Sequence, residues 1–81
     1  MPYIDVISRQ RLEKHPPETM GELTYVLYKA CRHYINKEKK GYKYQQLAEV
    51  LAALEAAKLE FYARVVRPYE DIKIKANGDV F

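Results

Sequence analysis

The sequence predicts a mainly α-helical protein, a helical hairpin with one long C-terminal helix, and three observations lead to this prediction. Apolar residues recur at spacings of three and four through the middle of the chain, the pattern of an amphipathic helix. The stretch from Tyr44 to Val66 contains no Gly or Pro and six Ala, a composition that favours helix strongly. The chain has 81 residues, which suits one small domain, residues 1–81.

Residues 1–18 are expected to form an arm. The β-branched residues up to Ile7 favour an extended strand, whereas Ser8 and the residues after it could form one or two capped helical turns. Pro16 and Pro17 then exclude helix across the junction, because each ring fixes φ and disfavours helix in the residue before it. Both conformations stay open for the segment before the prolines.

A first helix is predicted over residues 19–37. Thr19 and Glu22 fit a capping box, in which the hydroxyl and the carboxylate each accept a free backbone N–H. Gly41 is expected to close the helix in a left-handed conformation, after lysines that suit its negative end. The apolar stripe of this helix, which we expect to be core, consists of Met20, Leu23, Val26, Leu27, Ala30, Cys31, Tyr34 and Ile35.

A second helix is predicted over residues 44–67, roughly 34 Å long at 1.5 Å per residue. Glu60 and Arg64 are expected to pair one turn apart. The alanines off the stripe, such as Ala52 and Ala56, either reflect helix propensity alone or leave room for a subunit contact. The expected stripe consists of Leu47, Val50, Leu51, Leu54, Ala57, Phe61 and Val65.

The tail, residues 68–81, has two interpretations. Pro68 is expected to stop or kink the long helix, and it also suits the first position of a new one. We favour a short helix from Pro68 to Ala76, capped by Asn77 and Gly78. The alternative is a hairpin, because residues 72–75 alternate with period two and Asn-Gly is a favoured hairpin turn.

Self-association is expected because the chain is small. A protein of 9.6 kDa buries only about 60% of its unfolded surface, so it needs additional stabilisation. Cys31 is the only cysteine, which excludes an intrachain disulfide. His15 and His33 do not form a recognisable metal-ligand set. A homo-oligomer is the remaining source of stability.

Composition also limits the function. No apolar run approaches the ~20 residues that span a bilayer, and there is no signal pattern, so we expect a cytoplasmic protein without membrane contact. The net charge is +3, too small an excess to predict a nucleic-acid partner. Ser8 lacks a glycine elbow, and Cys31 lies on an apolar stripe, so we expect no catalytic residue, no cofactor and no enzymatic activity.

Eight tyrosines are the unusual feature of the composition. Tyr25, Tyr28 and Arg32 share one helix face, and Lys58, Tyr62 and Tyr69 would align if the second helix continued through Pro68. Tyr offers a flat face for a base and Arg a planar fork for phosphate. The alternatives are tyrosines bordering the core or a protein interface. The candidate ligand-binding residues are Tyr25, Tyr28, Arg32, Lys58, Tyr62, Arg64, Arg67 and Tyr69.

Four segments carry a resemblance to a family of short uncharacterised bacteriophage and prophage proteins. They are residues 1–4 (Met-Pro-Tyr-Ile), 21–25 (Gly-Glu-Leu-Thr-Tyr), 54–62, and the close from Pro68-Tyr69-Glu70-Asp71 to Asn77-Gly78-Asp79-Val80-Phe81. The resemblance implies a compact helical protein and carries over no functional residue. Where relatives tend to have Arg-Arg this chain has Ala63-Arg64, and it ends in Phe81 where Tyr is common, so roles at those two positions are in doubt.

These observations predict a homo-oligomer that binds and sequesters a small anionic, nucleotide-like ligand between its subunits. If the chain is phage-encoded, it resembles in type the small proteins that block nucleotide signals of host defence in the host cytoplasm. A pocket between chains is expected because two helices and an arm cannot surround a ligand alone. The alternative is a protein interaction module that docks through its Tyr-rich helical faces.

Overall fold

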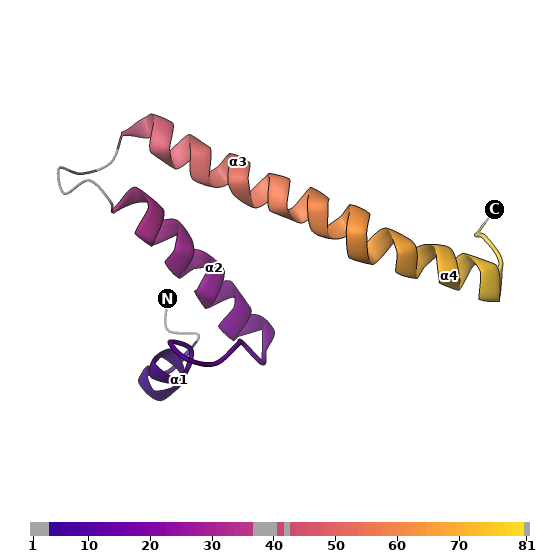
Figure 1. The fold of residues 1–81 in the computed structure, drawn as a ribbon, viewed down its shortest axis with the longest axis horizontal. Helices are drawn as coiled ribbons and strands as arrows, with labels where there is room; N and C mark the ends of the chain where they lie inside the picture. Colours follow the sequence, from indigo (N-terminus) through magenta and orange to yellow (C-terminus); the bar gives the residue numbers. More distant parts are fainter. Residues whose placement is uncertain (1–3, 37–40, 42, 81) are drawn as a thin grey trace. The chain divides into compact units, whose positions relative to one another are not determined.

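All regular structure that the computed structural model describes is helical, and no strand occurs among the described residues, 4–36, 41 and 43–80 (Figure 1). The chain consists of two compact units, Met1–Lys43 and Tyr44–Phe81. The first contains α1 (Val6–Arg11) and α2 (Met20–Ile35). The second contains α3 (Tyr44–Phe61), the π-helical segment η1 (Tyr62–Val66) and α4 (Arg67–Asn77).

The arm contains a short helix that begins earlier than Ser8. Asp5 is the N-cap of α1, and its carboxylate accepts the backbone N–H of Ser8 at 2.7 Å. Ser8 is therefore the capped residue, and Ile7 is helical rather than extended. An Asp oxygen reaches the N–H three residues on as readily as a Ser hydroxyl does, so the first suitable cap begins the helix.

The predicted cap of α2 is confirmed. The hydroxyl of Thr19 accepts the N–H of Glu22 at 3.1 Å, and the carboxylate of Glu22 accepts the N–H of Glu18 at 2.9 Å. The helix ends at Ile35, whereas the prediction placed its end at Lys37. The N–H of Asn36, the C-cap residue, still bonds to the carbonyl of Arg32. Gly41 has the expected positive φ, 86°, but lies well beyond this end. Lys37, Lys39 and Lys40 lie outside the described residues.

The prediction that the apolar stripe of α2 is core is wrong for most of its residues. Met20 is 84% exposed, and Leu23 and Leu27 are nearly half exposed. Ile35, 6% exposed, is the only described residue of the chain that is buried. The only other helix described in its unit, α1, has six residues, which is too short to cover a 16-residue neighbour. The half-buried residues of α2 are Gly21, Glu22, Tyr25, Val26, Lys29, Cys31 and Arg32.

The second unit is one continuous helix from Tyr44 to Asn77, and the ribbon runs without a break from α3 to α4 in Figure 1. The start at Tyr44 confirms the prediction. Of the outcomes expected at Pro68, a stop does not occur; the regular α-helix is interrupted by η1 and resumes as α4, with Pro68 in its first turn. In η1 the N–H of Arg67 bonds to the carbonyl of Tyr62, five residues back. Pro68 has no N–H, and its ring would clash with a carbonyl in a regular turn. The wider π turn accommodates the proline.

The tail is helical, as the favoured interpretation predicts, so the hairpin is wrong. Ile72 to Lys75 lie inside α4. Gly78 ends the helix with φ 81°, and its N–H bonds to the carbonyl of Ile74 at 2.8 Å. A positive φ is available to Gly without the Cβ clash that other residues suffer, which is why Asn77-Gly78 terminates the helix. Phe81 lies outside the described residues.

Candidate interaction and ligand-binding surfaces

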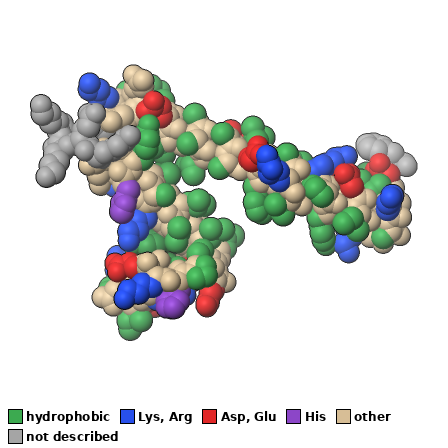
Figure 2. All heavy atoms as spheres, viewed as in Figure 1, with side chains coloured by type: hydrophobic (Ala, Val, Ile, Leu, Met, Phe, Trp, Pro, Cys, Tyr) green, Lys and Arg blue, Asp and Glu red, His purple; other side chains and the backbone are tan. Residues whose placement is uncertain are grey.

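The long helix exposes large apolar side chains along its whole length. Leu51 is 69% exposed, Phe61 60% and Ile72 66%. In Figure 2, hydrophobic side chains lie open on its visible surface between the charged ones. We call the set that shares one side of the helix the apolar surface of the long helix; it consists of Leu47, Leu51, Leu54, Phe61, Val65, Tyr69 and Ile72. In unit 1, the exposed side of α2 adds Met20, Leu23, Leu27, Tyr28 and Tyr34.

The three cations among the candidate ligand-binding residues of the long helix each pair with an acidic residue of the same helix. Lys58 contacts Glu55 at 2.9 Å, and Arg67 contacts Asp71 at 3.2 Å. Arg64 pairs with Glu60, as predicted. These pairs are solvent-exposed at spacings of three and four, where an ion pair contributes only about 0.3–0.5 kcal/mol. A phosphate group, which carries more negative charge, could therefore displace these carboxylates from the Lys and Arg side chains with little loss of free energy.

The tyrosines of the long helix also have partners. The hydroxyl of Tyr62 donates to Glu70 at 2.9 Å, across the π turn. In a regular α-helix, residues eight apart differ by about 80° around the axis. The extra residue in η1 removes most of this offset, so the π turn makes the contact possible. Lys73 lies 5.6 Å from the centre of the Tyr69 ring, a cation–π distance.

Tyr69 also borders a shallow hollow at the C-terminal end of α4. Its volume is about 340 Å³, within the ~300–1,000 Å³ range of small-molecule sites. It is open to solvent and more apolar than polar, and it collects no group of cations. The lining residues are Tyr69, Glu70, Lys73, Ile74, Asn77, Gly78, Asp79 and Val80.

The predicted site residues of α2 lie in the more basic unit. Tyr25 and Arg32 are half-buried, whereas Tyr28 is 49% exposed. Lys29, which flanks them, lies 6.0 Å from the centre of the Tyr25 ring. The sequence has nine Lys and Arg against five Asp and Glu up to Lys43, but five against six from Tyr44 on. Long-range electrostatics therefore favours an anion near α2 over one on the long helix alone.

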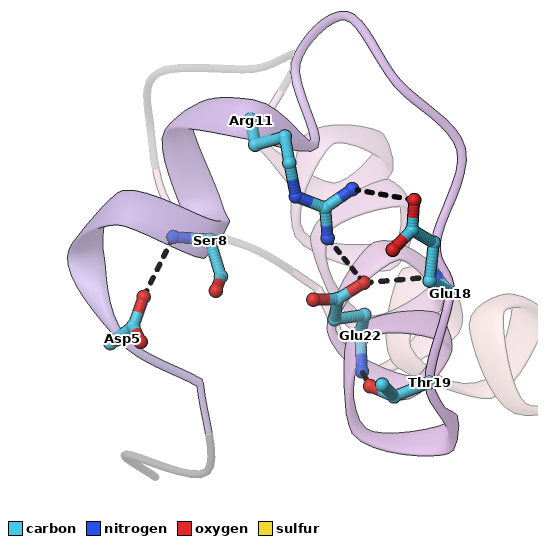
Figure 3. A network of polar contacts seen from close by, with 6 residues as sticks. All are labelled: Asp5, Ser8, Arg11, Glu18, Thr19 and Glu22. Carbon is cyan, nitrogen blue, oxygen red and sulfur yellow. Dashed lines mark hydrogen bonds and ion pairs between the residues drawn. The ribbon is translucent and has the colours of Figure 1, made fainter.

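A polar network between α1 and the start of α2 was not found by sequence reasoning (Figure 3). Arg11 contacts the carboxylate of Glu22 at 2.5 Å and that of Glu18 at 3.7 Å. The Glu22 side chain is 12% exposed, so it is the most shielded carboxylate of the network. The hydrogen bond from Arg11 and that from the Glu18 N–H both favour the charged form, and they lower the pKa of Glu22 below its usual 4.5.

The network predicts a stability that declines in acid. Because the pKa of Glu22 is lowered on folding, its carboxylate stabilises the folded state. This stabilisation is fully present above about pH 4.5 and is lost as the pH falls through the lower pKa of the folded state. The bond from Ser8 lowers the pKa of Asp5 in the same direction. We expect Glu22→Gln to melt at a lower temperature at pH 7 and to lose less stability than wild type on acidification. Thermal melts from pH 7 to pH 3 measure this.

Glu18→Gln is the matched control for the acid prediction. Its carboxylate is 75% exposed and 3.7 Å from Arg11, too far for a hydrogen bond. We expect its melting temperature to follow that of wild type across the pH range. Equal acid sensitivity of Glu22→Gln and wild type would contradict the role of Glu22 in this network.

No group of three or more His, Cys, Asp or Glu that could hold a metal ion occurs among the residues that the structure describes. In the same part of the chain, no helix has both the length and the apolar character required to cross a membrane.

The model of a family described as a domain of unknown function, DUF6899, matches residues 1–80. No curated protein and no solved structure matches the sequence.

Proposed function

The chain belongs to the DUF6899 family, and we propose that this protein is a homo-oligomer that binds a small anionic, nucleotide-like ligand between its subunits. The exposure of the apolar surface of the long helix carries the first half of this proposal. Phe61 and Ile72 are each at least 60% exposed, and burying such a side chain stabilises by about 1.5–3 kcal/mol. Soluble monomers rarely leave contiguous apolar patches open, so a second copy is a suitable cover.

The ligand half of the proposal is supported by the composition of the predicted site residues. Tyr25 with Lys29, and Tyr69 with Lys73, combine a ring and a cation at cation–π distance. The same chemistry stacks a base and holds a phosphate. Because the chain up to Lys43 has an excess of basic residues and the chain from Tyr44 on has none, we assign the main phosphate contact to Arg32 of α2, with Arg64 and Arg67 in support after exchange of their carboxylate partners.

The proposal also includes the cellular setting that the sequence predicts. A phage-encoded protein of this kind would act in the host cytoplasm and sequester a nucleotide signal of host defence. The resemblance to short phage proteins supports that setting. We propose no chemical step on the ligand.

A protein interaction module without a small ligand is the second candidate. The observation that favours it is the apolar character of the exposed residues, because Leu51 and Leu54 suit a protein surface better than a phosphate group. The partner would dock on the Tyr-rich and apolar faces of the helices.

Mass in solution and ligand-induced thermal stabilisation test the proposal together. Light scattering is expected to give at least twice the 9.6 kDa of the chain. A panel of cyclic and linear nucleotides at about 1 mM is expected to raise the melting temperature with at least one member, since ligand binding stabilises the folded state. A monomer would contradict the oligomer. An oligomer that no nucleotide stabilises would favour the interaction module.

A further inference from the structure

We infer that two copies of the long helix pair antiparallel, with the pair centred between Phe61 and Tyr62. This inference rests on the proposed self-assembly and adds the orientation and register of the partner. It follows from the charge of the two halves of the helix. The half from Tyr44 to Phe61 carries Glu49, Glu55 and Glu60 against Lys58, and the half from Tyr62 to Asn77 carries Arg64, Arg67, Lys73 and Lys75 against Glu70 and Asp71.

The net charge is therefore −2 for the first half and +2 for the second. Local pairs do not remove this asymmetry, because Glu55–Lys58 and Arg67–Asp71 each lie within one half. A parallel pair would place like-charged halves side by side, whereas an antiparallel pair places each negative half against a positive one. The helix dipoles favour the same orientation. Charge complementarity thus selects a second copy in antiparallel orientation as the partner.

The centre of the pair is set by the charge boundary, which falls between Glu60 and Arg64. With the centre between Phe61 and Tyr62, Leu54 lies level with Tyr69 of the partner subunit. Leu54 is 38% exposed and Tyr69 60%, so both have surface to bury. After the extra residue of η1 is discounted, Tyr69 lies close to four turns beyond Leu54, at about 3.6 residues per turn, and hence on the same side of the helix.

Disulfide trapping in the full-length protein tests the orientation. Cys31 is first replaced, Cys31→Ser, and Leu54→Cys and Tyr69→Cys are made separately in that background. In an antiparallel pair, two copies of Leu54 lie about 22 Å apart along the axis, at 1.5 Å per residue, beyond the ~7 Å limit between the Cα atoms of a disulfide. We expect a covalent dimer when the two variants are mixed and oxidised, and none from either variant alone.

Ala52→Cys, mixed with Tyr69→Cys, is the matched control, because Ala52 lies at nearly the same level on the opposite side of the helix; it is expected not to crosslink. The molar mass of each variant is measured by light scattering before oxidation. A covalent dimer from Leu54→Cys alone would overturn the antiparallel orientation and leave self-assembly intact. An oligomer without the mixed crosslink would overturn the register. Monomeric variants from a monomeric wild type would overturn the self-assembly on which the inference rests.

Discussion

A Leu54→Glu, Phe61→Glu double variant is expected to lose self-association while its helices remain. Both side chains belong to the apolar surface of the long helix, and Phe61 is 60% exposed in the single chain. Burial of each contributes about 1.5–3 kcal/mol. Their loss together, about 3–6 kcal/mol, raises the dissociation constant by roughly a hundredfold or more. Light scattering across a dilution series measures the mass, and circular dichroism reports the helix content.

A single pair of variants controls for the added charge. Ala57→Glu and Ala52→Glu make the same substitution in the same helix, but Ala57 lies on the apolar stripe and Ala52 lies off it. On dilution, we expect the Ala57→Glu variant to dissociate, and its mass to fall, at a higher protein concentration than wild type. We expect the Ala52→Glu variant to dissociate at the same concentration as wild type. If both variants weaken assembly equally, the effect comes from helix charge and not from a buried face, and the interface lies elsewhere.

The element boundaries that the sequence predicted correctly are those set by local chemistry. Thr19 caps α2 because its hydroxyl is within reach of the Glu22 N–H. Gly78 ends α4 because it accepts a φ of 81°. Such signals involve residues three or four apart, and no other part of the chain can easily override them.

The core could not be predicted in the same way. The stripe from Met20 to Ile35 shows that a helix has an apolar side, but not whether another element covers that side. The structure leaves Met20 84% exposed and half-buries Tyr25 and Arg32 instead. The Arg11–Glu22 pair escaped prediction for a related reason, because the two residues come from different helices and Glu22 was already explained by its cap.

Some contacts of the candidate site could likewise be predicted from local spacing, and others could not. The pair Glu60–Arg64 was predicted from its spacing, and the spacings of Glu55–Lys58 and Arg67–Asp71 held the same signal. The bond between Tyr62 and Glu70 could not be predicted, because eight residues align only across a π turn. The sequence showed a proline in a helical pattern, and whether it ends the helix or is accommodated depends on the backbone register.

Pro68→Ala is expected to convert the long helix to a regular α-helix and to stabilise it. Alanine restores a backbone N–H and removes the ring that clashes in a regular turn. A proline inside a regular helix costs about 3 kcal/mol, and the π turn already accommodates part of this. We therefore expect a gain of about 1–2 kcal/mol in unfolding free energy, measured by thermal and urea denaturation. Arg67→Ala, one residue earlier, is the control, since it restores no donor.

The same substitution is expected to weaken assembly, because removal of the extra residue rotates α4 against α3 by about 100°. Tyr62 and Glu70 then lose their alignment, and the exposed apolar side chains of α4 turn by the same angle relative to those of α3. Tyr62→Phe and Glu70→Gln, made singly and together, are expected to show energetic coupling with Pro68 present and none in Pro68→Ala. A more stable variant with unchanged coupling and unchanged mass would show that the proline does not hold the π turn. A more stable helix with a lower mass would mean that the proline costs the single chain stability and aligns its surface for a second copy.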